Sequence, residues 1–165
     1  MRVGIGYDIH PFDPNRACVI GGVRIENTWG LRGHSDADVL LHAIGDACLG
    51  AAALGDLGEH FPDTDPTWRG APSAVLLARI LELVRAKGLS PTNVDATVVC
   101  ERPKIAPHRE AMRERLAALM SLPIERVSVK ASTNNGLGAL GRVEGVAALA
   151  IVMLEEGVAA PPPPP

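Results

Sequence analysis

The segment RVGIGYDIH at residues 2–10 constrains the fold most, because it alternates strictly between two kinds of residue. Residues i and i+2 of a strand point to the same face. One face of this predicted strand is apolar or aromatic, and the other carries only glycine before it ends in Asp8 and His10. A face that is bare of side chains and ends in two potential metal ligands predicts a cavity. The alternative is an edge strand whose polar residues point into water, since a metal site needs at least a third ligand.

The composition excludes several classes of protein. The chain has 165 residues, enough for one domain, with 47% apolar and only 3% aromatic residues, which predicts an aliphatic core. The net charge of -3 and the absence of a basic stripe argue against nucleic-acid binding. We see no signal peptide and no apolar run of the roughly 18 residues that a membrane span requires. The cysteines (Cys18, Cys48 and Cys100) fit neither a disulfide framework nor a Cys-x-x-Cys zinc site, so we expect a cytoplasmic protein.

Hydrophobic periodicity predicts an α+β fold, with a mixed β-sheet and helices packed on one face in a two-layer sandwich. We expect a single domain over residues 1–157 and a disordered proline-rich tail over 158–165. Gly21-Gly22 predicts a hairpin turn, and the Gly-, Pro- and Asp-rich segment 55–66 predicts a loop. The predicted strands are 2–9, 18–21, 23–25, 94–100, 126–132 and 143–154, and the predicted helices are 36–52, 73–87 and 107–120.

The predicted helix 36–52 carries a third candidate metal ligand, His42, beside its apolar stripe. Ser35 just ahead of this helix and Asp38 three residues later resemble a capping box, with Asp in the usual Glu position. Asp38 and Asp46 are the i−4 and i+4 neighbours of His42. Because a metal-bound histidine commonly donates its second ring N–H to a carboxylate, we expect Asp46 to accept that hydrogen bond. The alternative for His42 alone is an ordinary charged helix surface.

Together, Asp8, His10 and His42 would supply one oxygen and two nitrogen ligands and leave a fourth position open. That arrangement is typical of a reactive zinc site rather than a structural one. His34 and Ser35 lie at the predicted start of the same helix, where free N–H groups attract phosphate. A zinc ion beside a phosphate pocket fits chemistry on a phosphoryl group.

Four blocks of sequence carry a resemblance to a known family. They are YDIH at residues 7–10, GHSDADVLLHAIGDACLGAAALGDLGEHFPDTDP at 33–66, ERPKIAPH at 101–108, and VKAST with GRVEG between 129 and 145. In this order they resemble the 2-C-methyl-D-erythritol 2,4-cyclodiphosphate synthase family, over residues 1 to about 155.

The resemblance implies a phosphorus–oxygen lyase of the non-mevalonate isoprenoid pathway. In that family the 2-phosphate of 4-diphosphocytidyl-2-C-methyl-D-erythritol 2-phosphate attacks the β-phosphorus of the same molecule, and CMP leaves. The family is a homotrimer with active sites at subunit interfaces, without nucleic-acid or membrane partners. By resemblance Asp8, His10 and His42 hold Zn²⁺, and His34 and Thr133 polarise the phosphates. The implied substrate contacts are Ser35, Asp56, Leu57, Gly58, Phe61, Pro62, Asp63, Thr64, Asp65, Cys100, Glu101, Arg102, Pro103, Lys104, Ile105, Ala106, Ser132, Asn134, Asn135 and Arg142.

The chain departs from the family pattern at two positions. Asn135 stands where the family usually has a glutamate that binds a second divalent ion, and an amide is a weaker ligand for a hard cation. We therefore expect Mg²⁺ or Mn²⁺ to be held mainly by substrate phosphates. Ala139 replaces a phenylalanine near the trimer axis, whereas Arg142 is kept, so an isoprenoid diphosphate in that axial cavity is put in doubt. We interpret Glu144 as structural.

Two other functions remain open at this point. The same three ligands would serve a zinc-dependent phosphoesterase, in which metal-bound water attacks the phosphate. A non-catalytic trimer that binds nucleotides or isoprenoid diphosphates is the second alternative.

Overall fold

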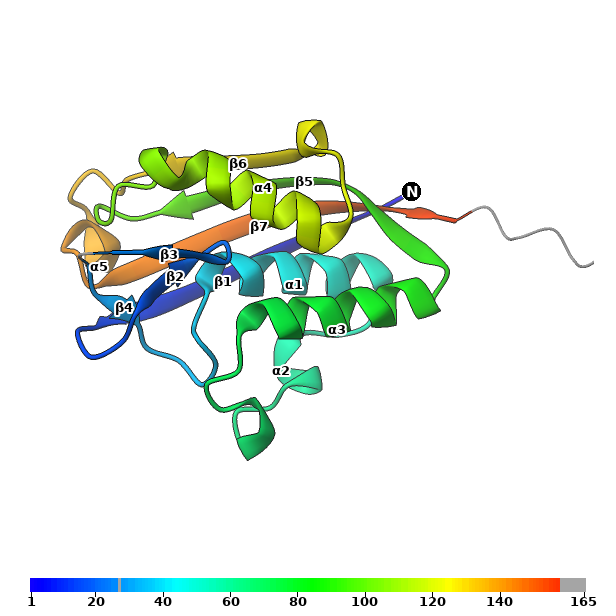
Figure 1. The fold of residues 1–165 in the computed structure, drawn as a ribbon, viewed down its shortest axis with the longest axis horizontal. Coiled ribbons are helices and arrows are strands. Elements are labelled where there is room, and N and C mark those ends of the chain that lie inside the picture. The colour runs from blue at the N-terminus through cyan, green and yellow to red at the C-terminus, as the bar shows by residue number, and fades with distance from the viewer. Residues whose placement is uncertain (27, 158–165) are drawn as a thin grey trace, which may run out of the picture.

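A computed structural model describes residues 1–26 and 28–157 of the chain. A five-stranded sheet forms one layer, and the three long helices form a second layer on one of its faces (Figure 1). The predicted α+β class, with helices on one face of a mixed sheet, is confirmed. The predicted tail, 158–165, lies outside the described residues. No helix within the described ranges has the length and hydropathy to cross a membrane.

The sheet has the strand order β4-β1-β7-β5-β6, in which β5 and β6 are parallel and every other pair is antiparallel. A separate hairpin, β2-β3, turns at Gly21-Gly22, where both residues have positive φ as a tight hairpin requires. The strands are β1 (Arg2–Asp13), β2 (Cys18–Ile20), β3 (Val23–Ile25), β4 (Gly30–Leu31), β5 (Leu89–Val99), β6 (Val127–Ser132) and β7 (Gly145–Glu156).

Helices α1, α3 and α4 form the layer over the sheet, and short helical turns connect the remaining segments. The α-helices are α1 (Val39–Ala52), α2 (Leu57–His60), α3 (Ser73–Ala86), α4 (Arg109–Met120) and α5 (Gly138–Gly141). The 3₁₀ turns are η1 (Pro66–Trp68), η2 (Ala106–His108) and η3 (Ile124–Arg126).

Helix α1 lies directly against the glycine face of β1. A methyl group on Gly4 would come within 2.0 Å of the Ala47 carbonyl oxygen, and one on Gly6 within 1.9 Å of that of Ala43. The prediction of a cavity over this face is therefore wrong along most of its length, because the helix backbone fills the space. Beyond Gly6 the situation changes, and the side chains of Asp8 and His10 line a pocket.

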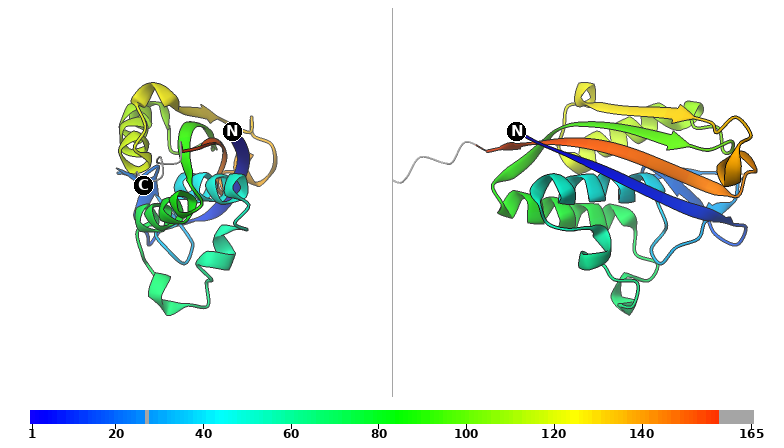
Figure 2. Two further views of the ribbon diagram at one scale, coloured as in Figure 1. Left: turned by 90° about the vertical axis from the view of Figure 1, so that its right-hand side faces the viewer. Right: turned by 180° about the vertical axis from the view of Figure 1, so that it is seen from behind.

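The opposite face of β1 is apolar and uncovered in the single chain. Ile5 is 69% exposed and Tyr7 is 53% exposed, and Ile151 of the neighbouring β7 is 47% exposed. The rear view in Figure 2 shows the strands on this side with the helices behind them. An apolar face of this size on a central strand pair is typical of a surface that another subunit covers.

Helix α1 begins three residues later than the sequence predicts, because Asp38 is its N-cap. The Asp38 carboxylate accepts the N–H groups of Leu40 and Leu41, each at 3.1 Å. It also accepts the N–H groups of Gly21 and Gly22, at 2.8 and 2.6 Å. The predicted capping box with Ser35 as the cap is therefore wrong, and the true cap joins the β2-β3 hairpin to α1.

Three further boundaries differ from the predictions. Strand β5 begins at Leu89 rather than residue 94, since a bulge between Pro91 and Asn93 accommodates the proline next to β7. The predicted loop 55–66 contains the single turn α2, which Asp56 caps through the N–H of Glu59. Strand β1 continues past residue 9 to Asp13, because β4 pairs with its end.

Candidate functional site

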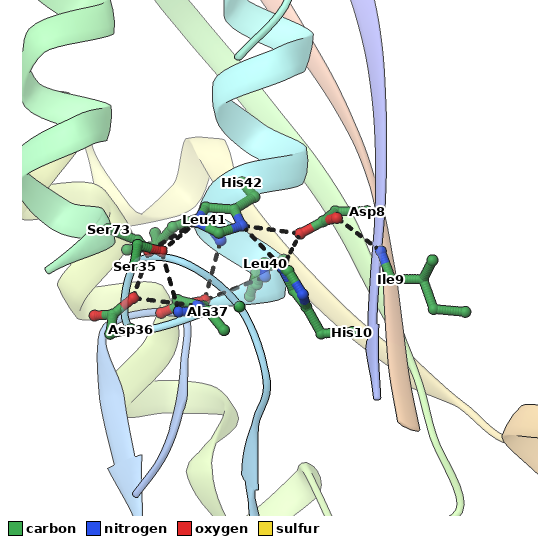
Figure 3. A network of polar contacts seen from close by, with 12 residues as sticks. Asp8, Ile9, His10, Ser35, Asp36, Ala37, Leu40, Leu41, His42 and Ser73 are labelled. Atoms are coloured by element: carbon green, nitrogen blue, oxygen red, sulfur yellow. Dashed lines mark hydrogen bonds and ion pairs between the residues drawn. The ribbon is translucent and has the colours of Figure 1, made fainter. Parts of the chain in front are cut away.

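The three predicted metal ligands meet where β1 passes the first turn of α1 (Figure 3). Asp8 Oδ2 lies 2.9 Å from both His10 Nε2 and His42 Nδ1. The two imidazole nitrogens lie 3.2 Å from each other. His42 is only 12% exposed at its side chain, so its interpretation as an ordinary surface residue is wrong.

This triangle of atoms fits a metal ion. In a tetrahedral zinc site with bonds of ~2.0–2.1 Å, neighbouring ligand atoms lie roughly 3.3 Å apart. The three separations here are close to that value, and two imidazole nitrogens with one carboxylate oxygen form a donor set that zinc accepts. Asp8, His10 and His42 are therefore a group able to bind a metal.

The charges of the group stabilise one another in the absence of a metal. Burial alone would raise the pKa of Asp8, but hydrogen bonds to His10 and His42 and their charges hold it well below its usual range. Burial alone would lower the pKa of His42, but the hydrogen bond and the charge of Asp8 raise it above its usual value.

The second ring nitrogen of His42 is held by two serines rather than by Asp46. His42 Nε2 lies 3.0 Å from Ser35 Oγ and 2.9 Å from Ser73 Oγ. The Ser73 hydroxyl in turn donates to Asp36 Oδ1. This chain of contacts is drawn in Figure 3 and fixes the orientation of the His42 ring.

The prediction for Asp46 is thus wrong, because its carboxylate accepts the Leu57 N–H at 2.8 Å instead. An i+4 spacing puts Asp46 on the same side of α1 as His42 but does not determine which group the carboxylate meets. Ser73 and Asp36 were not predicted from the sequence. A serine directly after Pro72 reads as an ordinary helix start, and only the packing of α3 on α1 brings it to His42.

The N-terminus of α1 does not offer the free phosphate-binding N–H groups that the sequence predicts. The Asp38 carboxylate already occupies the N–H groups of Leu40 and Leu41.

A pocket of about 580 Å³ opens over the metal group. His34 lies in its wall, and the Nε2 atom of His34 is buried without a hydrogen-bond partner among the described residues. A buried polar atom without a partner favours a ligand that would form a hydrogen bond with it. The lining residues are Asp8, His10, His34, Ser35, His42, Asp46, Leu57, Gly58, Phe61, Pro62, Asp63, Trp68 and Leu76.

The loop after α1 supplies only part of its predicted contacts to this pocket. Leu57, Gly58 and the run 61–63 lie in the wall. Asp56 and Asp65 instead cap short helical turns, by accepting the N–H groups of Glu59 and Thr67. Thr64 is not among the lining residues. Trp68, which was not predicted from the sequence, packs edge-on against Phe61 with ring centroids 4.9 Å apart.

The segments predicted to bind the nucleotide form a separate pocket of about 240 Å³. Thr133 lies in its wall rather than beside His34. Burial raises the pKa of the Cys100 thiol to about 11, so the thiol stays protonated near neutral pH. The lining residues are Cys100, Pro103, Lys104, Ile105, Ala106, Arg109, Ala131, Ser132 and Thr133.

Glu101, Arg102, Asn134 and Asn135 are not among the residues that line this second pocket. Glu101 accepts the N–H groups of Asn134 and Gly136, at 3.1 and 3.2 Å, and so shapes the turn that carries Asn135. Arg102 lines a different hollow, of about 510 Å³, together with the exposed Trp29.

Arg142 lies apart from both pockets. Its guanidinium pairs with Glu144 at 2.6 Å on the exposed surface. Ala139 is also exposed, in the adjacent turn α5. One chain therefore holds the metal group and the predicted nucleotide segments in two pockets that share no lining residue.

Comparison with known proteins places this arrangement in a family. Residues 1–155 match the model of the YgbB family. The chain is 55% identical to the 2-C-methyl-D-erythritol 2,4-cyclodiphosphate synthase of Salinibacter ruber, over 94% of this chain and 99% of that protein. It is also 55% identical to the protein of the same name from Geobacter sulfurreducens, with the same shares covered.

Solved structures agree with the sequence matches. A 2C-methyl-D-erythritol-2,4-cyclodiphosphate synthase in its CDP-bound form is 40% identical with a TM-score of 0.86, over 93% of this chain and 100% of that one. The bifunctional IspDF of Campylobacter jejuni is 42% identical with a TM-score of 0.90, over 94% of this chain and 42% of that one. Because the family model matches residues 1–155 and relatives of 55% identity align over nearly the whole length, the chain belongs to the YgbB family.

Proposed function

We propose that this protein is a 2-C-methyl-D-erythritol 2,4-cyclodiphosphate synthase. It converts 4-diphosphocytidyl-2-C-methyl-D-erythritol 2-phosphate to the cyclic diphosphate and releases CMP, in the non-mevalonate pathway of isoprenoid precursor synthesis. The observation that carries the proposal is the convergence of Asp8, His10 and His42 beneath one pocket that His34 also lines, in a chain of the YgbB family.

The metal group is proposed to hold Zn²⁺. Three protein ligands leave a fourth position free, and zinc bound there would supply positive charge to a phosphoryl oxygen. Ser35 and Ser73 keep the His42 ring in position for this. His34 donates a hydrogen bond from Nε2 to the phosphate that reacts, because that atom faces no competing acceptor among the described residues.

The reaction needs no protein nucleophile, since the 2-phosphate of the substrate attacks its own diphosphate. The protein has to fold the substrate so that attacking oxygen and β-phosphorus meet. Such positioning can lower a barrier by roughly 7–11 kcal/mol. The loop residues Leu57, Gly58 and Phe61–Asp63 are proposed to grip the methylerythritol part of the substrate.

The second pocket is proposed to bind the cytidine and its phosphates. The backbone of residues 100–106 recognises the base. Ser132 and Thr133 in the pocket wall contact the phosphates, together with the adjoining Asn134 and Asn135. Mg²⁺ or Mn²⁺ would be held mainly by the substrate phosphates, because Asn135 offers only a neutral oxygen.

The two pockets are proposed to meet across the subunit interface of a homotrimer. A separation of the metal group from the nucleotide segments within one chain supports this, since one substrate has to reach both. The uncovered apolar face of β1 and β7 supplies a surface suited to such an interface. A reducing cytosol is the proposed compartment, where Cys18, Cys48 and Cys100 stay as the free thiols that the structure has.

Mass-spectrometric product analysis tests the proposal. The purified protein is given the cytidine diphosphate substrate with zinc and magnesium, beside a His42→Ala variant. Cyclic diphosphate and CMP from the wild type alone are expected. An open-chain phosphate with CMP would indicate a phosphoesterase instead, and bound but unreacted substrate would indicate a binding protein.

A further inference from the structure

Arg16, in the turn after β1, is a charged residue that the proposed mechanism does not use. Its guanidinium donates from Nη1 to the carbonyl oxygen of Gly33 and from Nη2 to that of Ser35. Among the ion pairs of the described residues, none involves Arg16. The side chain therefore directs its charge at the two carbonyls on either side of His34.

Arg16 is itself held in place by the backbone. Its carbonyl oxygen accepts the Gly30 N–H at 2.9 Å, and its N–H reaches the Asp13 carbonyl at 3.3 Å. A methyl group on Gly30 would come within 2.5 Å of the Arg16 oxygen, so only glycine allows the two segments to lie this close. The guanidinium thus extends from a fixed base rather than from a free loop.

The loop that Arg16 holds contacts both histidine ligands. A methyl group on Gly33 would come within 3.0 Å of His10 Cε1, so the loop backbone lies against that imidazole. Two residues later, Ser35 Oγ lies 3.0 Å from His42 Nε2. Between them His34 turns into the pocket, and its own carbonyl accepts the Gly70 N–H at 2.8 Å.

We infer that Arg16 is a positioning residue, whose guanidinium fixes the Gly33–Ser35 loop so that His10 and His42 keep the geometry for a metal and His34 stays in the pocket. The effect on turnover rests on the proposed function, whereas the effect on metal binding does not. Arginine suits this task because its planar fork donates two parallel hydrogen bonds, whereas a lysine ammonium is a point charge that cannot reproduce the fork.

Zinc affinity of the full-length protein provides the primary test, measured by competition with a chromogenic chelator in the absence of substrate. We expect Arg16→Ala to weaken zinc binding about tenfold, as loss of outer support typically does, and Arg16→Lys to fall between it and the wild type. Arg24→Ala is the matched control, because among the described residues that guanidinium pairs only with the exposed Glu26. Zinc affinity of Arg16→Ala equal to that of Arg24→Ala would overturn the inference.

Chemical rescue separates positioning from general damage to the fold. Guanidinium ion at millimolar concentration should restore zinc affinity to Arg16→Ala by occupying the vacated position, and should leave Arg24→Ala unchanged. If guanidinium ion does not restore zinc affinity to a folded Arg16→Ala protein, that result counts against a positioning role of the paired hydrogen bonds. If Arg16→Ala does not fold, hydrogen exchange is compared between Arg16→Lys and the wild type. Faster exchange at the Asp36 and Ala37 amides of Arg16→Lys supports the inference, and unchanged exchange overturns it.

Turnover gives an independent reading. We expect kcat of Arg16→Lys to fall while KM stays within about twofold. The substitution leaves residues 57–63 and the nucleotide pocket, which are proposed to bind the substrate, untouched, whereas it shifts the loop that carries His34. A wild type that binds zinc without forming product would refute the proposed function and leave the zinc test intact. Product formation with unchanged zinc affinity in Arg16→Ala would refute this inference alone.

Discussion

Gly6 of β1 lies so close to Ala43 of α1 that a methyl group on it would come within 1.9 Å of the Ala43 carbonyl oxygen. This contact sets the distance between the strand that carries Asp8 and His10 and the helix that carries His42. The spacing of the metal group is therefore determined by a residue with no side chain.

Gly6→Ala should destabilise the protein by at least about 3 kcal/mol, because the obstacle is helix backbone that cannot rotate away. Urea unfolding of the metal-free protein measures the change. Gly50→Ala is the control, since Gly50 lies on the same helix with no atom within 4 Å of the added methyl group. That control should be stabilised by about 0.5–1 kcal/mol through helix propensity. Equal stability of both variants would contradict the packing described here.

Asp38→Asn should destabilise the protein by about 2–3 kcal/mol. The carboxylate accepts four backbone N–H groups and is fully buried, whereas an amide would turn its NH₂ group toward one or more of those donors. Urea unfolding again gives the value. Asp13→Asn, at an exposed carboxylate that accepts one N–H, should change the free energy of unfolding by less than about 0.5 kcal/mol.

Ser73→Ala should weaken zinc binding by about tenfold, because it removes one of the two hydroxyls on His42 Nε2. Asp46→Asn should leave zinc affinity within about twofold, since its carboxylate contacts the Leu57 N–H and not the imidazole. Isothermal titration with zinc compares the two. The reverse order of effects would restore Asp46 as the partner of His42.

The metal-free protein should be most stabilised by its Asp8–His42 contact between about pH 4 and pH 6.5. Because folding lowers the pKa of Asp8, this carboxylate stabilises the folded protein at pH values above its unfolded-state pKa. That stabilisation is lost as the pH falls through the folded-state pKa. The raised pKa of His42 gives stability that is complete below its unfolded-state pKa and is lost as the pH rises through the folded-state pKa. The difference in unfolding free energy between wild type and Asp8→Asn, measured in EDTA, should therefore peak in this window. A flat difference from pH 4 to pH 9 would argue against the contact.

Asn135→Glu should tighten magnesium binding to the complex with a cytidine diphosphate, on the order of tenfold, by adding a charged oxygen ligand. Asn135 has a φ of 51°, which asparagine tolerates better than glutamate does, so some stability will be lost. Magnesium titration of the nucleotide complex measures the affinity, with Asn134→Glu as the neighbouring control. Unchanged affinity in Asn135→Glu would mean that the phosphates alone hold the ion.

Local patterns predicted the elements and the three metal ligands well, because both depend on spacing along the chain. The alternation around Asp8 and His10 and the helical phase of His42 were enough to suggest the group. Side-chain partners were predicted less well. Asp46 has the spacing of a partner for His42, yet Ser73 from a distant helix takes that position. Such a contact depends on how α3 packs on α1, which no local pattern contains.

The same limit explains the error at the start of α1. Ser35 and Asp38 both have side chains that cap helices, and sequence spacing alone favoured the first. The β2-β3 hairpin decides between them, because its N–H groups at Gly21 and Gly22 need the buried carboxylate of Asp38. Ser35 is then free to contact His42.

The register of β1 against β7 bears on how the protein can be joined to others. Arg2 pairs with Leu154 at one end of the sheet, whereas His10 pairs with Val146 at the other. At about 3.3 Å per residue, eight residues of strand put roughly 26 Å between that first pair and the histidine. A partner domain, an affinity label or a solid support attached beside the exposed Arg2 would thus stand well clear of the metal group of the same chain.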